Sequence, residues 1–369
     1  MPKTIALTLN SAWNILNFRR QLVLALVQEG YRVLAIAPDA PERIKIEELG
    51  ATFIPLQRLA RKGTNPYRDL QLVRELTRIY RREKVDVALH YTIKPVIYGT
   101  YAAQRSGTLV INTITGLGYS FLTKSWVNQV VRRLYRRALR RAELTLFQNP
   151  DDGQLFLDAK LVPANRAALV PGSGIDTKHF LQKPLPENEP LKMLFIGRLL
   201  SDKGLREFVA AAEYLRKYKS QLQCQVLGAV DHQNPAAIDE EELAGWVAEG
   251  AIEYLGTTTD IRPFIEAATV VVLPSYREGL PRVLLEAAAM GRPLIATDVP
   301  GCREVIDSGK NGYLVSVKNA EELASAMDQM LQLSTEQRSA MGLASRQLAE
   351  QRFEIQIVVE QYLEIISKL

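Results

Sequence analysis

The stretch TVVVLPSYREGLPRVLLEAAAMGRPLIATD, residues 269–298, contains the unit from which this chain is built. It begins with an apolar, β-branched run at 269–275, continues through a short polar loop, and shows helical spacing over 281–290. A second apolar run follows at 293–298. Because strand, helix and strand occur in this order, the stretch predicts a βαβ unit with two buried parallel strands.

The same alternation extends outward to both ends of the chain. Strands are predicted at residues 4–10, 31–38, 52–56, 85–91, 109–113, 144–148, 167–171, 192–197, 224–230, 252–256, 269–275, 293–298 and 312–316, and three closing helices at 319–332, 335–350 and 354–367. One segment rich in Pro and Gly, 171–192, interrupts the rhythm. We therefore predict two doubly wound α/β domains. The expected parts are an N-terminal domain at 1–175, a linker at 176–190, a C-terminal domain at 191–350, and a helix at 351–369 that packs back toward the N-terminal domain.

Composition excludes several classes of protein. The 369 residues are 47% hydrophobic and 24% charged, which is typical of a folded globular protein. Cys224 and Cys302 are too few for a disulfide framework or a four-cysteine zinc site. The first residues show no signal-peptide pattern, and the longest uncharged run, 106–123, is half Ser, Thr or Gly. A cytoplasmic location without a membrane span is expected.

Two glutamates, Glu278 and Glu286, lie eight positions apart in the βαβ unit. Pro281 suits a first helical turn, which puts Glu278 in the loop just before the helix. The free N–H groups of a helix N-terminus can bind an oxygen-rich ligand, and two carboxylates there suit the hydroxyls of a sugar or ribose. Glutamates on a solvated helix face are the competing interpretation, and the Glu-Gly-Leu-Pro context favours the ligand.

Two cations follow another predicted strand, in FIGRLLSDKG at residues 195–204. Arg198 comes directly after the strand, and Lys203 opens the next helix. A strand end, two cations and a helix N-terminus in one place favour the binding of a phosphate.

With these motifs the chain resembles glycosyltransferase family 4, whose members have the α/β GT-B fold of two facing Rossmann-like doubly wound domains. Glu278 and Glu286 match the Glu-x7-Glu signature of that family, and 195–204 matches its G-R and K-G segment. PGSGID, residues 171–176, matches the loop before its linker. The resemblance spans the whole chain.

The resemblance implies that the C-terminal domain binds a nucleotide sugar, in particular a UDP-sugar. Arg198 and Lys203 would clamp the diphosphate, Glu286 would bind the ribose, and the base would lie near 227–229 and 254–256. The residues expected at the donor sugar are Glu278, Gly279, Leu280 and Pro281. Arg198, Lys203 and Glu278 are thus also the expected catalytic residues.

The same family retains anomeric configuration, so the resemblance implies an α-glycosidic product. The chain has no convincing Asp-x-Asp motif, and neither a metal nor another cofactor is expected. We interpret Asp151, Asp152 and Gly153 as a helix N-cap rather than a metal site.

The N-terminal domain would bind the acceptor. Residues 92–99 and 113–121 resemble a subset of the family that builds surface polysaccharides and lipid-linked oligosaccharides, including undecaprenyl-diphosphate-sugar N-acetylgalactosaminyltransferases. The expected acceptor contacts are Asn10, Asn14, Arg19, Lys94, Gly116 and Gly118. The first loop departs from the family pattern because it lacks Gly-Gly.

His90 ends a predicted strand and has two interpretations. A neutral imidazole there could accept the proton of an acceptor hydroxyl, which would make His90 catalytic. Alternatively, His90 is a packed histidine at the edge of the sheet. His179 and His232 are expected to be solvated.

Positive charge is concentrated in the first half of the chain. The first 180 residues contain 27 Lys or Arg and 14 Asp or Glu, whereas the remaining residues contain 19 and 27. In VVRRLYRRALRR, residues 130–141, helical spacing gathers arginines on one half of the helix and apolar residues on the other. The arginines expected at an anionic membrane surface are Arg132, Arg133, Arg136, Arg137, Arg140 and Arg141.

This helix also has a plainer interpretation, in which its apolar half packs on the sheet and its arginines are only solvated. The two interpretations are compatible. Nucleic acid is a less suitable partner, because no interleaved aromatic residues or known binding module accompany the charge.

The leading hypothesis is a retaining hexosyl or N-acetylhexosaminyl transferase. It would be peripheral at the inner face of the cell membrane and would use a UDP-sugar and a polyprenyl-diphosphate-linked sugar or glycan acceptor. Its product would serve surface-polysaccharide or glycoprotein-glycan assembly. The alternatives are a transferase with a small soluble acceptor, a GT-B-fold sugar-nucleotide epimerase, and a non-catalytic membrane scaffold.

Overall fold

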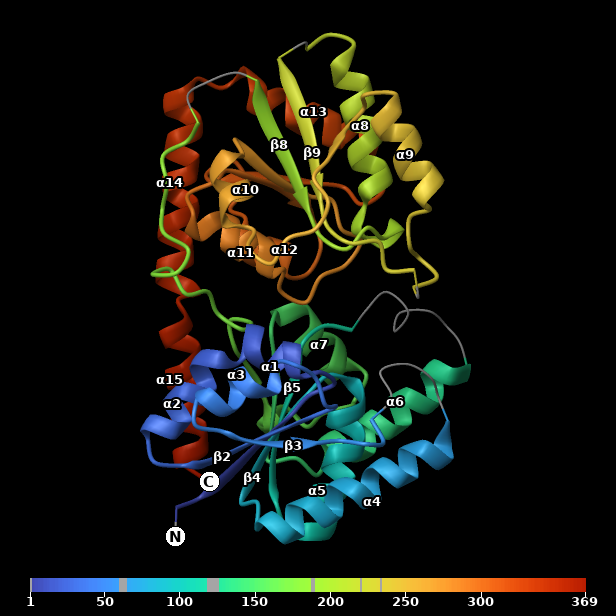
Figure 1. The fold of residues 1–369 in the computed structure, drawn as a ribbon, viewed down its shortest axis with the longest axis vertical. Coiled ribbons are helices and arrows are strands. Elements are labelled where there is room, and N and C mark those ends of the chain that lie inside the picture. The colour runs from blue at the N-terminus through green and yellow to red at the C-terminus, as the bar shows by residue number, and fades with distance from the viewer. Residues whose placement is uncertain (1, 60–64, 118–125, 187–189, 220, 233) are drawn as a thin grey trace. The chain divides into compact units, whose positions relative to one another are not determined.

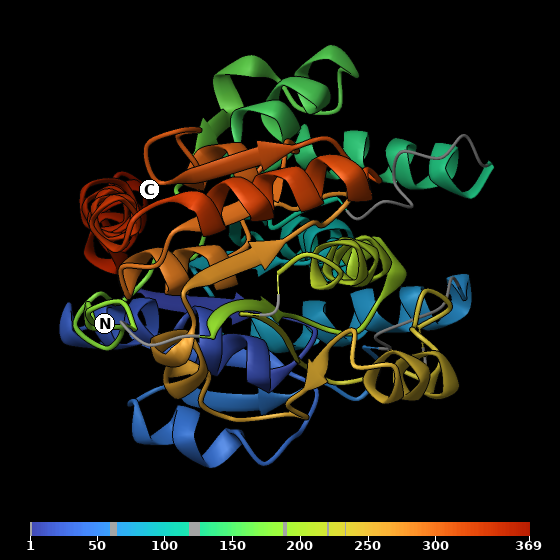
Figure 2. The same cartoon turned by 90° about the horizontal axis from the view of Figure 1, so that it is seen from above.

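The structure is a computed structural model that describes residues 2–59, 65–117, 126–186, 190–219, 221–232 and 234–369, without the side chains of Trp126 and Val127. The chain forms two compact units. One contains Met1–Ser173 and Ile355–Leu369, and the other contains Gly174–Glu354. Each unit is a parallel β-sheet with helices on both faces (Figure 1 and Figure 2).

The first unit holds a seven-stranded parallel sheet in the order β3-β2-β1-β4-β5-β6-β7, counted over the described residues. Its strands are β1 (Thr4–Thr8), β2 (Arg32–Ala37), β3 (Thr52–Pro55), β4 (Val87–Tyr91), β5 (Leu109–Ile114), β6 (Leu144–Phe147) and β7 (Ala167–Leu169). Its helices are α1 (Ala12–Phe18), α2 (Arg20–Gln28), α3 (Arg43–Glu48), α4 (Pro66–Glu83), the π-helical turn η1 (Pro95–Gly99), α5 (Thr100–Ser106), α6 (Trp126–Leu139), α7 (Pro150–Asp158), the 3₁₀ turn η3 (Ala164–Arg166) and α15 (Ile355–Ser367).

Alternation along the strands explains why helices cover both faces of this sheet. Ile5 and Leu7 of β1 point into a core formed with α1, α2, α3 and α15, whereas Ala6 points into the core under α4 and α5. Successive side chains of a strand face opposite sides, so a central strand that is apolar throughout must be covered twice.

The second unit holds a six-stranded parallel sheet in the order β10-β9-β8-β11-β12-β13 among the residues described. Its strands are β8 (Leu191–Ile196), β9 (Leu222–Leu227), β10 (Glu253–Tyr254), β11 (Val270–Leu273), β12 (Leu294–Thr297) and β13 (Gly312–Val315). Its helices are the 3₁₀ turn η4 (Ser201–Lys203), α8 (Leu205–Arg216), α9 (Glu240–Ala248), α10 (Arg262–Ala267), α11 (Arg282–Ala289), α12 (Cys302–Val305), α13 (Ala320–Gln332) and α14 (Thr335–Arg352). Met193 and Phe195 pack under α8 and α13, while Leu194 and Ile196 face α11 and α14.

The predicted α/β class is confirmed, and all thirteen predicted strands are present within a few residues of their expected ends. One local prediction is wrong. The N-cap of α7 is Asn149, whose side chain accepts a hydrogen bond from the backbone N–H of Asp152 at 2.7 Å, and the two aspartates lie in the first turn.

The segment predicted as a linker packs along the second unit wherever the structure describes it. Arg346 on α14 donates to the carbonyl oxygens of Thr177 at 3.2 Å and Phe180 at 2.8 Å. The buried Arg292 donates to the carbonyl oxygen of Pro184 at 3.0 Å. Residues 174–186 therefore form part of the second unit rather than a free connection.

Candidate functional site

The order of the strands puts one topological switch point in each sheet. In the second sheet the chain runs outward through β8, β9 and β10 and then returns to β11 on the other side of β8. In the first sheet the same reversal lies between β1 and β4. Doubly wound sheets bind ligands beyond the carboxyl ends of the strands at such points. The predicted donor motifs follow β8 and β11, and the predicted acceptor residues follow β1, β4 and β5.

The backbone joins the ends of β8, β9 and β10, where a nucleotide base was predicted. The N–H of Gly197 donates to the carbonyl oxygen of Leu227 at 3.0 Å, and the N–H of Gly228 donates to that of Gly256 at 2.9 Å. Gly228 has φ +156°, and a Cβ atom there would lie 1.7 Å from the carbonyl oxygen of Gly197. Only glycine allows these two chain segments to approach so closely.

A second close approach joins the loops that follow β8 and β11. Gly204, the N-cap of α8, has φ +73°, and a Cβ atom there would lie 2.0 Å from the carbonyl oxygen of Pro274. The N–H of Tyr276 donates to the carbonyl oxygen of Asp202 at 2.9 Å, and its hydroxyl donates to Glu207 at 2.7 Å. The loop that carries Glu278 is thereby fixed against the start of α8.

This contact brings two predicted site residues together. Lys203 and Glu278 form an ion pair, although they are 75 positions apart in the sequence. Both side chains are mostly buried, with 21% of Lys203 and 13% of Glu278 exposed. The pair therefore presents one cation and one carboxylate side by side at the switch point.

The other predicted cation has a different partner. Arg198 donates to Asp231 at 3.1 Å, and its side chain is 53% exposed. Within the described residues, no hydrogen bond or ion pair joins Arg198 to Lys203 or Glu278, so the two halves of the predicted clamp do not contact each other directly. Sequence reasoning missed Asp231, because nothing in its surroundings marks it as the partner of a cation.

Glu286 lies on α11 and is 9% exposed. It accepts a hydrogen bond from Arg282, one turn earlier on the same helix, at 2.7 Å. Burial raises the pKa of the Glu286 carboxyl, and the charge of Arg282 partly offsets this rise.

The remaining predicted donor residues form the loop in front of α11. Gly279 and Pro281 are buried, and Pro281 is the N-cap of the helix rather than its first residue. Leu280 packs on the core of the second unit. A Cβ atom at Gly301, where φ is +81°, would lie 2.4 Å from the carbonyl oxygen of Gly279, so a third loop supports this one.

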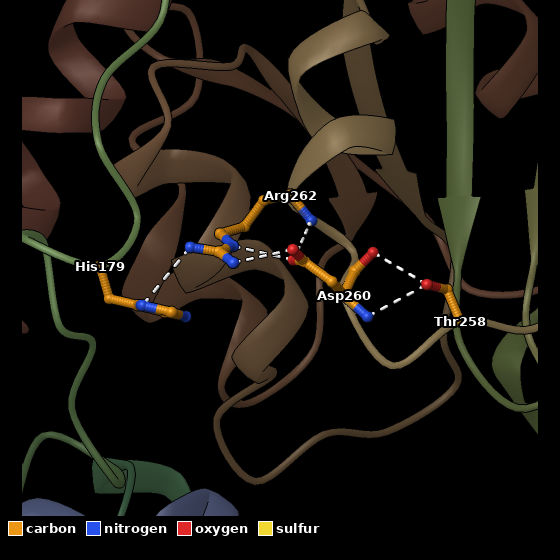
Figure 3. Close-up of polar contacts among 4 residues, drawn as sticks. All are labelled: His179, Thr258, Asp260 and Arg262. Atoms are coloured by element: carbon orange, nitrogen blue, oxygen red, sulfur yellow. Dashed lines mark hydrogen bonds and ion pairs between the residues drawn. The ribbon is translucent and has the colours of Figure 1, made fainter.

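A polar cluster fixes the loop between Gly256 and α10 (Figure 3). Asp260 accepts two hydrogen bonds at 2.8 Å from the guanidinium of Arg262, which lower its pKa to about 2. The Thr258 hydroxyl accepts from the N–H of Asp260 at 3.0 Å, and Nδ1 of His179 lies 3.5 Å from Arg262. His179 is exposed as expected, yet it is one of the contacts between residues 174–186 and α10.

In the first unit, a buried cation lies at the switch point. Arg19 is only 4% exposed, and its guanidinium carbon lies 4.2 Å from the ring centre of Tyr91 at the end of β4. Tyr362 of α15 packs on Tyr91 and exchanges a 2.7 Å hydrogen bond with Thr113 of β5. Within the described residues, Arg19 has no ion pair with a carboxylate.

The other predicted acceptor contacts are only partly available. Lys94 donates to Asp69 at 2.9 Å, and Tyr98 donates to the same carboxylate at 2.8 Å. The Asn14 amide donates to Asn10 at 2.7 Å. Gly116 follows β5 with φ +128°, and Gly118 lies outside the described residues. Asp69 was not predicted, because its acidic side chain occurs on a strongly basic helix.

The interpretation of His90 as a packed core residue fits the structure, and a proton-accepting role does not. Its ring is 0% exposed, Nε2 lies 2.9 Å from the hydroxyl of Tyr80, and Nδ1 lies 3.2 Å from the amide oxygen of Asn112. Burial lowers its pKa to about 4. A Cβ atom at Gly99 would lie 2.7 Å from Nε2, so helix backbone covers the ring. No acceptor hydroxyl can reach it without displacing this packing.

The basic helix α6 packs by its apolar half. Tyr135 and Leu139 are buried in a core shared with α7 and the end of β6, and Ala138 between them is also buried. On the other half, Arg136 donates to the carbonyl oxygens of Ala159 and Lys160 at the end of α7. The remaining predicted arginines stay on the solvent side, half-buried at one position and exposed at the others; they are Arg132, Arg133, Arg137, Arg140 and Arg141.

The described residues contain neither a candidate metal site nor a candidate membrane span. No group of three His, Cys, Asp or Glu side chains lies close enough together to hold a metal ion. No described helix combines the length and apolar character that crossing a membrane would require.

Comparison with known families and proteins identifies this arrangement. Residues 190–333 match the glycosyl transferases group 1 family, and residues 17–172 match the glycosyl transferase 4-like domain. The N,N'-diacetylbacillosaminyl-diphospho-undecaprenol alpha-1,3-N-acetylgalactosaminyltransferase of Campylobacter jejuni is 25% identical over 374 residues, and the match covers 96% of both chains. The UDP-Gal:alpha-D-GlcNAc-diphosphoundecaprenol alpha-1,3-galactosyltransferase of Escherichia coli is 21% identical and covers 70% of both.

Solved structures show the same fold at lower sequence identity. HepE of Anabaena in complex with UDP aligns over 100% of both chains with a TM-score of 0.80 and 18% identity. A glycosyltransferase of Rickettsia africae aligns over 100% of this chain and 98% of its own, with a TM-score of 0.79 and 19% identity. This chain therefore belongs to the group 1 glycosyltransferases with a family 4-like N-terminal domain and has the GT-B fold.

Proposed function

We propose that the protein is a retaining glycosyltransferase that moves a hexose or N-acetylhexosamine from a UDP-sugar to a polyprenyl-diphosphate-linked sugar. The product would be an α-glycoside in surface-polysaccharide or glycoprotein-glycan assembly. The observation that carries this proposal is the ion pair of Lys203 and Glu278 at the switch point of the second sheet. It supplies a cation for a leaving diphosphate next to a carboxylate for sugar hydroxyls. The named acceptor of the Campylobacter jejuni relative supports the choice of acceptor.

The donor-side residues have separate parts in this reaction. As the bond between the anomeric carbon and the diphosphate breaks, Lys203 and Arg198 would stabilise the charge that develops on the leaving oxygen. Once Lys203 turns toward phosphate, the Glu278 carboxylate is free to accept hydrogen bonds from the sugar. Glu286 would accept the ribose hydroxyls. The acceptor proton would pass to a donor phosphate oxygen, because His90 is enclosed in the core of the first unit.

A donor screen tests the proposal directly. The protein is incubated with a set of nucleotide sugars, with and without an undecaprenyl-diphosphate-linked sugar, and nucleotide release and product linkage are measured. We expect release from a UDP-sugar to rise strongly with the lipid-linked acceptor and the product to be an α-glycoside. Stimulation by small soluble sugars alone would contradict the proposed acceptor, and a β-linked product would contradict retention.

Metal dependence provides a first prediction. Activity should survive an excess of EDTA, because two side-chain cations are available for the diphosphate and the sequence has no Asp-x-Asp motif. The measurement is the initial rate of nucleotide release before and after chelation. A complete loss of rate that Mg²⁺ or Mn²⁺ restores would show that the diphosphate depends on a metal.

Glu286→Gln should raise the KM for the donor about tenfold and leave kcat nearly unchanged. A ribose contact acts equally in the ground and transition states, and one hydrogen bond to a charged group contributes about 1.5 kcal/mol. In the parent, protonation should also raise the KM at acid pH, because burial raises the pKa of Glu286. The variant should lack this pH dependence.

The matched control is Glu350→Gln. Glu350 pairs with Arg346 at the same i,i+4 spacing on α14, at 2.7 Å. It should leave the donor KM unchanged. A fall in kcat alone in Glu286→Gln would contradict the ribose role.

Attachment to an anionic membrane surface completes the proposal. Because Tyr135, Ala138 and Leu139 are buried in the first unit, this part of α6 would act on a membrane through its arginines. Its solvent-facing arginines, with Arg133, Arg137 and Arg140 as the clearest examples, would hold the protein near its lipid-linked acceptor.

A further inference from the structure

A groove between α4 and α5 in the first unit is the strongest unassigned feature of the molecule. Its volume is about 800 Å³, and it opens on the solvent side of α4. Five arginines line it together with Leu70: Arg74, Arg78, Arg81, Arg82 and Arg105. None of the motifs in the sequence analysis includes them.

The acidic residues of α4 compensate only one arginine of this groove, Arg82, because the other carboxylates are engaged elsewhere. Asp69 is buried and accepts from Lys94 and Tyr98. Glu75 accepts from the backbone N–H groups of Gln57 and Arg58 at 2.8 and 3.0 Å. Glu83 binds Arg32 and Arg82 on the far end of the helix.

Four of the five guanidiniums consequently keep an uncompensated charge. Arg81 donates to the carbonyl oxygen of Arg105, and Arg105 donates to that of Tyr101 at 3.0 Å, and both acceptors are neutral. Within the described part of the chain, Arg74 and Arg78 make no hydrogen bond or ion pair. Like charges gathered around a concave surface repel one another, and an anion in the groove would relieve that repulsion.

The arginines of the groove have further arginines next to them, on the polar face of α6 and just after its end. Helix α5 packs against both α4 and α6, and the three helices lie next to one another in Figure 1. Arg105, Arg137 and Arg141 all act on the hydroxyl of Tyr101, where their charges oppose the rise in pKa that burial causes. Arg141 also donates to Gln104 of α5 at 2.7 Å. Arg105 thus belongs to both the groove and the α6 face.

We infer that the α4–α5 groove binds the phosphate headgroup of an anionic phospholipid and that α4, α5 and α6 form one membrane-facing surface. Guanidinium forks suit phosphate oxygens. Exposed apolar side chains accompany the charge, because Leu70 is 43% exposed in the groove and Tyr67 is 66% exposed one turn earlier. This mixture favours a lipid surface over a free phosphate or a nucleic acid. The inference rests on the membrane attachment proposed above and does not depend on the sugar-transfer reaction.

Vesicle sedimentation with the full chain tests the inference. Binding to vesicles of phosphatidylcholine with 30% phosphatidylglycerol should fall about 30-fold in the double variant Arg74→Gln/Arg78→Gln, given roughly fivefold for each arginine. The control Arg20→Gln/Lys45→Gln removes the same charge from exposed positions on α2 and α3, outside the groove. This control should lower vesicle binding several-fold less than Arg74→Gln/Arg78→Gln does. Equal losses in the two double variants would overturn the inference, because net charge alone would then explain binding.

Further arms distinguish the source of the phosphate. Millimolar pyrophosphate should displace the protein from vesicles no better than KCl of the same ionic strength, and stronger displacement would assign the groove to a soluble anion. An oligonucleotide that binds the parent more tightly than the vesicles, and loses binding in Arg74→Gln/Arg78→Gln, would assign it to nucleic acid. Circular dichroism and the Tm should be unchanged, because Arg74 and Arg78 have no partner among the described residues.

Two further measurements separate the groove from the α6 charges and from the transfer reaction. If Arg133→Gln/Arg137→Gln lowers vesicle binding and Arg74→Gln/Arg78→Gln does not, the proposed membrane attachment stands and the groove assignment fails. Nucleotide release from the donor without acceptor should be the same in all these variants, since none of the residues lies in the second unit.

Discussion

Lys203→Ala should lower kcat for sugar transfer by at least 100-fold while the protein remains folded. The reason is that Lys203 supplies a positive charge where negative charge develops on the leaving diphosphate, and the loss of one such group costs a factor of about 100 to 1,000. The effect should appear in the single-turnover rate with saturating donor, which isolates the chemical step from product release.

The chain offers a matched control three residues after Lys203, in the first turn of α8. Arg206 forms an exposed ion pair with Glu242 at 2.7 Å. Arg206→Ala therefore removes a cation and breaks an ion pair, as Lys203→Ala does, but it leaves Lys203 and Glu278 in place. It should change kcat less than twofold. Arg198→Ala should also impair donor use. Parental turnover by Lys203→Ala would rule out the proposed clamp, and an equal loss in Arg206→Ala would indicate a structural effect on α8.

The fold could be predicted because its signals are local. Runs such as VVVL before Pro274 are too apolar for a surface strand, and helical spacing separates them at regular intervals. The breaks between elements are harder to predict. Helices α1 and α2 are separated at Arg19, whose φ of −130° leaves the helical region, and no glycine or proline marks the position.

The donor side of the candidate site was predicted as separate motifs, and their meeting follows from strand order. Lys203 comes after β8 and Glu278 after β11, and these strands are neighbours because the chain reverses there. The sequence shows that each residue follows a strand but not which strands pair. A parallel sheet at a switch point then places the two loops together.

The sequence could not show which polar groups are already engaged. His90 lies next to the last residue of β4, where a catalytic base could be expected, yet Tyr80 and Asn112 from other elements enclose it. Lys94 is held by Asp69 through a contact that spans 25 positions. Such pairings depend on helix rotation and packing depth, which the spacing of residues along the chain does not specify.

Arg19 differs from these residues, and its substitution is the second prediction with a large effect. Its guanidinium is 4% exposed and lies against Tyr91, and no carboxylate pairs with it in the described structure. Burying a cation without a counter-charge costs several kcal/mol, of which a cation–π contact returns about 2. A residue held at such a cost is typical of a binding site rather than of a packed core. We propose that it binds a phosphate of the acceptor diphosphate.

Arg19→Met should therefore lower kcat/KM for the lipid-linked acceptor about 100-fold, equivalent to two charge-assisted hydrogen bonds of about 1.5 kcal/mol each. The Tm should stay the same or rise, because a methionine of similar length fills the space without a buried charge. Nucleotide release without acceptor should be unaffected, and Arg20→Met, at the exposed neighbouring position, should change neither property. The kcat/KM of Arg19→Lys should lie between that of the parent and that of Arg19→Met, because lysine keeps the charge and loses the planar fork. A lower Tm with parental transfer would reduce Arg19 to a packing residue, whereas a higher Tm with lost transfer can be explained only by an anion that the folded protein binds at this position.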